Sequence, residues 1–231
     1  MVIRLFMSKK NMARKKKYYD IVTIFPEIVE PYLQGSILGR AQKNGLLKLT
    51  AHDLRLWSPD KKHHKVDDTP YGGGPGMVMQ IEPFHKAVSM LKQKKKKTRV
   101  ILTSASGKRF TQEDVVRFSV YDQLIFLCGR YEGVDARVET DVVDESISIG
   151  DYVLTGGELA ALVITDAVAR LHPGVLGKGV SLEMESHTTQ GILEYPQYTK
   201  PFIYEMKNSP KGKKHTLKVP EILLSGNHKE I

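Results

Sequence analysis

The chain has 231 residues, of which 41% are hydrophobic, so it can bury a core and is not globally disordered. A single cysteine, Cys128, excludes an internal disulfide and a zinc site built from several cysteines, which fits a reducing, cytoplasmic setting. The apolar stretches are too short to span a bilayer, and no apolar signal-peptide segment follows the basic N-terminus. The net charge of +9 indicates an anionic partner.

The excess positive charge is concentrated at the N-terminus. Residues 1–17 hold seven basic residues and no acidic one, whereas the rest of the chain is nearly balanced. Such a run is more often a solvated tail than a specific binding arm, so we expect residues 1–17 to be a disordered leader.

The first half of the chain alternates between strand and helix patterns. The predicted elements are a buried strand at Tyr19–Phe25, a helix opened by Pro26 and limited by Pro31, a helix at Ser36–Lys43 closed by Asn44 and Gly45, a strand at Leu46–His52, a glycine-rich loop at 58–76, a helix at Ile81–Leu91 and an exposed loop at Lys94–Lys97.

The second half continues the alternation. The predicted elements are a strand at Arg99–Leu102, a helix capped by Thr111 and Asp114, strands at Gln123–Cys128 and Val142–Ile149, and an apolar helix at Leu159–Leu171 that a Thr155/Glu158 capping box precedes. This order predicts an α/β fold with a largely parallel sheet. The pattern weakens from Gly177, which indicates an interdomain linker.

Two glycine-containing loops are candidate ligand sites. The loop at Tyr71–Gly76 is followed by no Gly-Lys-Ser/Thr and is not directly preceded by a strand, so it is neither a phosphate loop nor a dinucleotide fingerprint. A tight structural turn and a binding loop fit it equally. The segment Cys128–Gly133 follows a core strand, where parallel sheets bind ligands. Its Arg130 and Glu132 fit either contacts to a polar ring or an ion pair at the strand end, and Cys128 fits a core position better than a nucleophile.

The loop at Ser148–Glu158 is the strongest cofactor candidate from physical chemistry alone. Its glycines allow close approach of the backbone to a flat polar ligand, and its apolar side chains can flank such a ligand. Other polar residues are less specific. Glu185, on the linker, fits a solvated surface acid better than a general base when taken alone, and His63 and His64 lack the partners of a metal site.

Taken together, these segments closely resemble the bacterial tRNA (guanine-N1)-methyltransferase family, known as TrmD. The matching pieces, in chain order, are Ile24–Glu27, Gly39–Ala41, Asn44–Leu46, Val66–Met77, Cys128–Gly133, Ser148–Ala160, Pro173–Gly177 and Leu223–Ile231. Because eight pieces occur in register over residues 18–231, the resemblance covers nearly the whole chain.

The resemblance implies a SPOUT-type parallel sheet with a deep C-terminal trefoil knot, an arrangement that periodicity does not predict. It also implies S-adenosylmethionine as the methyl donor, tRNA as the substrate and a homodimer with a shared active site. The target would be guanosine-37, next to the anticodon. Mg²⁺ is associated with the family reaction, but the sequence contains no dedicated metal site.

The resemblance also assigns residues. The catalytic residues would be Arg170, Glu132 and Glu185, the last in place of the Asp of many relatives. The cofactor residues would be Thr103, Ser104, Gly129, Ile149, Gly150, Asp151, Tyr152, Val153, Leu154, Gly156 and Gly157. A carboxylate at 185 would take the N1 proton of guanine, and Arg170 would stabilise negative charge on guanine O6.

The implied domains are a knotted catalytic domain at 18–176, a linker at 177–191 that carries the base, and a short tRNA-binding domain at 192–231. The last is expected to be a truncated helical segment, because relatives continue beyond Ile231 with basic helical sequence. We hypothesise that the leader and the lysine-rich residues 211–218 supply tRNA contacts in its place.

Three other functions remain open at this point. One is a knotted methyltransferase that acts on another RNA base, and the second is a non-catalytic tRNA-binding homologue. The third, a generic nucleotide-binding α/β protein, is disfavoured because the lysine of a phosphate loop is missing.

Overall fold

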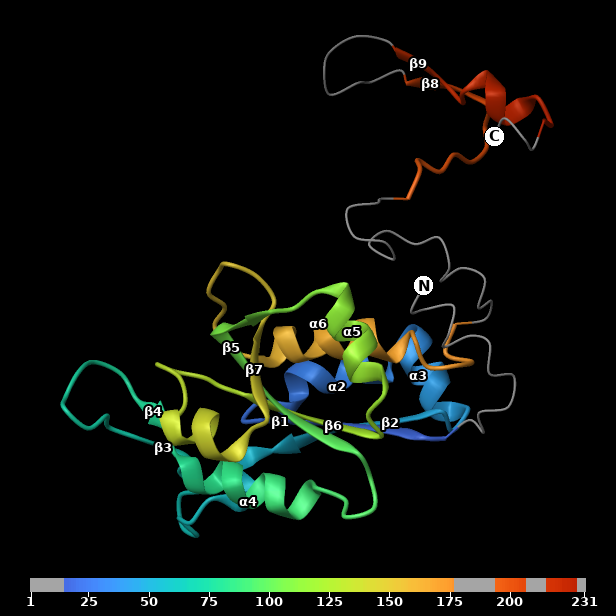
Figure 1. The fold of residues 1–231 in the computed structure, drawn as a ribbon. Helices are drawn as coiled ribbons and strands as arrows, with labels where there is room; N and C mark the ends of the chain where they lie inside the picture. Colours follow the sequence, from blue (N-terminus) through green and yellow to red (C-terminus); the bar gives the residue numbers. More distant parts are fainter. Residues whose placement is uncertain (1–14, 177–193, 207–214, 228–231) are drawn as a thin grey trace. The chain divides into compact units, whose positions relative to one another are not determined.

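The computed structural model describes residues 15–176, 194–206 and 215–227. Its main feature is a five-stranded sheet in the order β2-β1-β6-β5-β7, in which every neighbouring pair is parallel (Figure 1). The strands are β1 (Lys17–Thr23), β2 (Leu47–Asp53), β5 (Thr98–Arg109), β6 (Gln123–Cys128) and β7 (Glu145–Ser148). The predicted α/β class with a largely parallel sheet is therefore confirmed.

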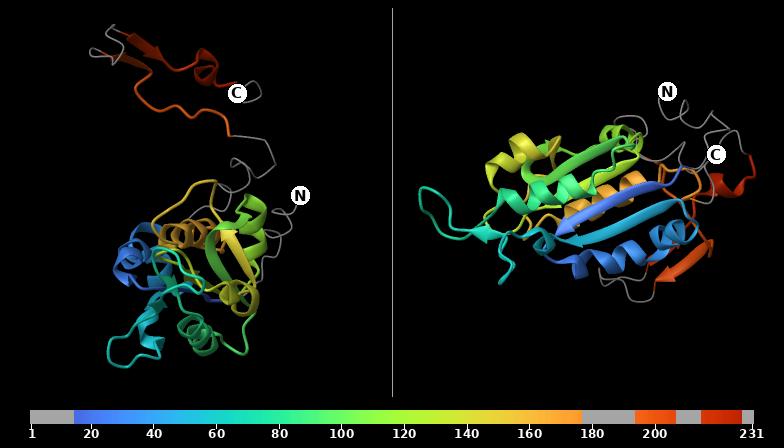
Figure 2. Two further views of the ribbon diagram at one scale, coloured as in Figure 1. Left: turned by 90° about the vertical axis from the view of Figure 1, so that its left-hand side faces the viewer. Right: turned by 90° about the horizontal axis from the view of Figure 1, so that it is seen from below.

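Helices cover both faces of the sheet, which gives three layers (Figure 2). One face packs against α2 (Pro26–Gln34), α3 (Ser36–Lys43), α5 (Gln112–Ser119) and α6 (Glu158–Ala169). The other packs against α4 (Ile81–Leu91), the 3₁₀ turn η1 (Leu54–Trp57) and the π-helical turn η2 (Val138–Val142). The central strand β6 is buried along its whole length because its alternate side chains enter the two cores.

Several predicted elements coincide with the observed ones. The helices Ser36–Lys43 and Ile81–Leu91 and the strand Gln123–Cys128 have the predicted bounds. Asn44 caps α3, and Gly45 follows with a φ of 72°, a conformation in which a side chain would be strained. The Asp114 carboxylate accepts hydrogen bonds from the amide and hydroxyl of Thr111, as the capping pattern predicts.

Other predictions were wrong in detail. Pro31 does not end α2, which continues to Gln34 because Val29 and Leu33, one turn apart, are both buried. The proline is exposed, so the hydrogen bond that it removes lies on the solvent side. The strand predicted at Val142–Ile149 is shorter, since Val142 belongs to η2.

The glycine-rich loop lies between two short strands that the sequence did not predict. β3 (Asp67–Asp68) pairs antiparallel with β4 (Val78–Met79), so the loop leaves and returns at one place. His63 and His64 of the preceding segment are exposed, as predicted.

Residues from Thr189 onward form a second compact unit. In its described part, β8 (Ile203–Met206) pairs antiparallel with β9 (His215–Lys218), and a 3₁₀ turn, η4 (Glu221–Leu224), follows. Within the described residues, the helical character expected here is limited to that turn. The leader residues 1–14 and the candidate base Glu185 lie outside the described residues. No helix of the described chain is long and apolar enough to cross a membrane.

Candidate functional site

The carboxyl ends of β5, β6 and β7 lie side by side and open into one cavity. Thr103 of β5 is in register with Cys128 of β6 and with Ile147 of β7. The segments that follow these strands enclose a volume of about 330 Å³. This volume lies within the range typical of small-molecule sites.

The residues assigned to the cofactor converge on this cavity. Ten of the eleven line it: Thr103, Ser104, Gly129, Ile149, Gly150, Tyr152, Val153, Leu154, Gly156 and Gly157. The exception is Asp151, whose exposed carboxylate pairs with Arg109 at 3.3 Å. Glu132 also lines the cavity, so segments far apart in the sequence meet at one place.

Two glycines of the loop after β7 have side-chain-free positions for steric reasons. A Cβ at Gly157 would lie 2.0 Å from Thr103 Oγ1 and 3.0 Å from the Cα of Cys128. The Gly157 amide donates to the Gly129 carbonyl at 3.0 Å, so the start of α6 touches the end of β6. Gly150 has a φ of 157°, and a Cβ there would collide with the ring of Tyr152.

The same loop carries exposed apolar side chains on the rim of the cavity. Tyr152, Val153 and Leu154 are all exposed, and Val153 retains 86% of its accessible surface. Large exposed apolar groups around a concave site are typical of ligand binding. They are suited to cover the flat face of a heteroaromatic ring.

A buried ion pair lies below the cavity, and the sequence predicted it only in part. Arg130 Nε donates to both carboxylate oxygens of Glu158 at 3.1 Å, and Thr23 Oγ1 donates to the same carboxylate at 2.6 Å. Arg130 also donates to the Thr155 carbonyl at 3.2 Å and lies over the ring of Phe25. The strand-end ion pair considered for Arg130 is therefore confirmed.

The predicted capping role of Glu158 was wrong. Gly157 is the N-cap of α6, and Glu158 is the first helical residue, with a side chain only 2% exposed. Its carboxylate is committed to Arg130 and Thr23, which come from other strands. The Arg in the segment after β6 and the acid at the helix start are the sequence signals, but nothing local indicates that they pair.

Cys128 is a core residue, as predicted. Its side chain is fully buried between β5 and α6, and burial together with the nearby Glu158 carboxylate raises the pKa of its thiol far above the ordinary range. A thiol in this environment stays protonated and is not a nucleophile.

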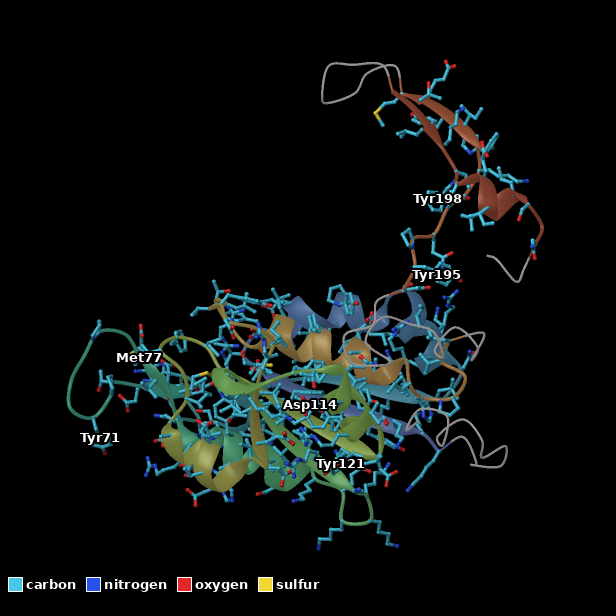
Figure 3. All side chains as sticks on the ribbon, turned by 45° about the horizontal axis from the view of Figure 1, so that its top comes forward. Tyr71, Met77, Asp114, Tyr121, Tyr195 and Tyr198 are labelled. Atoms are coloured by element: carbon cyan, nitrogen blue, oxygen red, sulfur yellow. The ribbon has the colours of Figure 1, made fainter. Side chains whose placement is uncertain are left out.

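The glycine-rich loop joins the segment that carries Glu132. The Glu132 amide donates to the Met77 carbonyl at 3.1 Å, and the Met79 amide donates to the Gly133 carbonyl at 3.0 Å. A Cβ at Gly76 would collide with the Glu132 side chain. Two of the sequence motifs are thus neighbours, while Tyr71 is fully exposed on the loop (Figure 3).

Arg170 lies in a second, open groove between α2, α6 and the loop after β7. Three residues, Ile149, Tyr152 and Leu154, line both this groove and the cavity, so the two adjoin. Partial burial and the neighbouring Asp166 carboxylate raise the pKa of the groove residue Tyr32. The structure therefore places Arg170 beside the cavity rather than in its wall.

The described residues contain no group of three or more His, Cys, Asp or Glu side chains arranged to hold a metal ion.

Comparison with known proteins identifies the family. The family model for tRNA (Guanine-1)-methyltransferase TrmD matches residues 17–231. A tRNA (guanine-N(1)-)-methyltransferase of Dictyoglomus turgidum is 53% identical over 212 residues, which cover 92% of this chain and 80% of that protein. The enzymes of the same name from Thermomicrobium roseum and Geobacter sp. (strain M21) are 50% and 48% identical, each over 92% of this chain and over 75% and 81% of their own lengths. The chain belongs to the tRNA (guanine-1)-methyltransferase TrmD family.

Proposed function

We propose that this protein transfers a methyl group from S-adenosylmethionine to N1 of guanosine-37 in tRNA, next to the anticodon. One observation carries the proposal: ten residues assigned to the cofactor from three separate segments line a single cavity. The family membership and the names of the relatives support the reaction class.

The cavity fits S-adenosylmethionine in size and chemistry. Its floor is backbone, kept free of side chains at Gly156 and Gly157, and its rim is apolar. Such a wall can hold an adenine ring by main-chain contacts and exclude water. When bound, the sulfonium supplies an electrophilic methyl group that needs in-line placement toward N1.

Three side chains are proposed to act on the guanine. Glu185 is the general base that takes the N1 proton. Arg170 stabilises the negative charge that develops on O6, and its groove adjoins the cavity through shared residues. Glu132, exposed in the cavity wall, orients the base through its polar edge. The guanine itself is expected to be flipped out and stacked.

A homodimer with a shared site is part of the proposal. Helix α6 is apolar on more than one side: Leu162 and Val168 are buried, whereas Leu159 and Val163 are about half exposed. An exposed apolar stripe beside the groove that holds Arg170 is the kind of surface that a second subunit covers.

The trefoil knot of the SPOUT class is also proposed. In β5, both Thr103 and Lys108 are in register with Ile147, so residues 104–107 form an extra loop beside β7. A Cβ at Gly107 would lie 2.6 Å from the backbone of Ser146 and Ile147, which indicates a close backbone crossing.

The domain organisation follows the same reasoning. We propose a catalytic domain at 18–176, a linker at 177–191 and a tRNA-binding segment at 192–231, with the basic leader 1–17 and residues 211–218 adding phosphate contacts in the cytoplasm. The proposal assigns no residue to the Mg²⁺ associated with the family reaction.

Transfer of tritiated methyl from S-adenosylmethionine to an unmodified tRNA transcript with guanosines at positions 36 and 37 tests the activity. We expect labelling that disappears when position 37 is adenosine and when Glu185→Ala is used. Labelling that survives the change at position 37 would place the methylated base elsewhere. Cofactor binding without labelling of any transcript would favour a non-catalytic tRNA-binding protein.

A further inference from the structure

Two lysine runs that are distant in the sequence meet at the amino edge of the sheet. Lys15–Lys17 lead into β1, and the turn Lys94–Lys97 leads from α4 into β5 (Figure 1). The Tyr18 amide donates to the Asp122 carbonyl at 3.0 Å, and the Asp122 amide donates to the Lys97 carbonyl at 2.8 Å. Backbone hydrogen bonds therefore fix both runs beside the start of β6. We call Lys15–Lys17 and Lys94–Lys97 together the amino-edge patch.

The positive charge of the amino-edge patch is poorly compensated. The Asp122 carboxylate lies 2.9 Å from Lys15 Nζ and 3.9 Å from Lys17 Nζ, and it also accepts from the Lys97 amide at 3.2 Å. None of the four lysines at 94–97 makes an ion pair with a carboxylate among the described residues. Lys94, Lys95 and Lys97 are exposed.

Aromatic rings restrain part of the patch. Lys96 Nζ lies 2.9 Å above the ring centre of Tyr18, and Lys97 Nζ lies 4.7 Å above that of Tyr121, which Figure 3 labels. Lys17 is partly buried, and its burial and the charges of Lys15 and Lys97 lower its pKa against the opposing effect of Asp122. The cations are thus crowded and partly ordered before any ligand binds.

We propose that the amino-edge patch binds the phosphodiester backbone of the tRNA, at a place separate from the cavity that holds the target base. This proposal rests on the proposed function. Lysine ammonium groups bind phosphate as point charges, without reading the base sequence. A polyanion compensates several such charges at once and releases its counterions, which favours nucleic acid over a partner with isolated carboxylates.

The geometry allows one tRNA to reach both places. The cavity lies at the carboxyl ends of β5 and β6, whereas the patch lies at their amino ends. A strand of the length of β6 spans roughly 20 Å at about 3.3 Å per residue. The patch would therefore contact phosphates beyond the target nucleotide and contribute affinity rather than chemistry.

The test is the salt dependence of binding of a fluorescein-labelled, unmodified tRNA transcript to the full chain. The variant carries Lys94→Gln, Lys95→Gln, Lys96→Gln and Lys97→Gln, and its matched control carries arginine at the same four positions. We expect the slope of log affinity against log salt to fall by about 2 to 3 in the glutamine variant, at roughly 0.7 to 0.9 per lost phosphate contact. The arginine variant should keep the slope of the unchanged protein.

A second variant, Lys94→Gln with Lys95→Gln, leaves the contacts with Tyr18 and Tyr121 in place and should lose about half as much slope. Affinity for S-adenosylmethionine and methyl transfer at saturating tRNA should be unchanged in both glutamine variants. An unchanged slope in both would overturn the proposal, as would an equal loss in the arginine control. A protein that binds tRNA with the expected slopes but methylates nothing would refute the proposed function and leave the amino-edge patch supported.

Discussion

At the scale of single residues, Gly157 shows how closely the cavity floor is packed. Its φ of −81° is open to any residue, so its constraint comes from neighbours rather than from backbone strain. Thr103 Oγ1, which donates to the Leu127 carbonyl at 3.1 Å, occupies the space that a side chain would need.

Gly157→Ala should therefore push the start of α6 away from β6. We expect a loss of about 1 to 3 kcal/mol in the free energy of unfolding, typical of overpacking, and at least a tenfold loss in affinity for S-adenosylmethionine. Urea unfolding and calorimetric titration measure the two effects. Gly35→Ala is the control, because a Cβ there meets its nearest atoms at 3.4 and 3.6 Å. Equal behaviour of the two variants would contradict the packing argument.

Glu158 is the second residue whose environment sets its importance. Removing one partner of a buried ion pair leaves the other charge without compensation. Glu158→Ala should lower the free energy of unfolding by about 3 kcal/mol and weaken cofactor binding, since Arg130 would lose its anchor beside Gly156.

The matched control for Glu158 is Glu82→Ala on α4, whose ion pair with Lys86 is half exposed and should contribute less than about 1 kcal/mol. Both variants are compared by urea unfolding at the same pH. If Glu158→Ala lost no more stability than Glu82→Ala, the buried network would not be what holds these loops together.

At the scale of elements, a charge network joins α5 to β5 and β7. Asp114 accepts from Lys108 at 2.6 Å and from Arg117 at 2.8 Å, and Arg117 also contacts Glu145. Burial by itself raises the pKa of Asp114, but the hydrogen bonds from Lys108 and Arg117 outweigh it, and the pKa lies below its ordinary value.

A pKa that is lower in the folded than in the unfolded state stabilises the fold above the unfolded value, about 4. That stabilisation is lost as the pH falls through the folded pKa. The native chain should therefore be more stable than Asp114→Asn at pH 7, and the difference should narrow below pH 4. Urea unfolding from pH 3 to pH 7 gives the difference directly. A difference independent of pH would show that the Asp114 charge contributes nothing.

At the scale of the whole molecule, the exposed stripe of α6 bears on the proposed dimer. Val163→Glu would place a charge on this stripe, where a partner subunit would have to bury it. We expect the dimer dissociation constant to rise at least 100-fold, about 2.7 kcal/mol, with loss of methyl transfer at low enzyme concentration.

Sedimentation velocity measures the subunit state in this experiment. Val120→Glu, at the end of α5, is the matched control, because that valine is exposed to a similar degree and lies outside the groove. If Val163→Glu sedimented as the native protein does, the dimer would use another surface.

The helices and strands were predictable where local pattern and burial agree. The strand Gln123–Cys128 is apolar throughout, and Ile81–Leu91 has helical periodicity. The prediction at Pro31 failed because burial of Val29 and Leu33 outweighs one lost hydrogen bond on the solvent side. The capping role predicted for Glu158 failed because its partners, Arg130 and Thr23, come from other strands.

The sequence alone determined the α/β class, the extent of the main helices and strands and the resemblance to the family, since these depend on local periodicity and on motifs in register. Only the tertiary structure brought Thr103, Gly129 and Gly157 together, paired Arg130 with Glu158 and joined the two lysine runs through Asp122. Strand order and the packing of α6 decide these contacts. They join residues that are far apart along the chain, and no local pattern encodes such a distance.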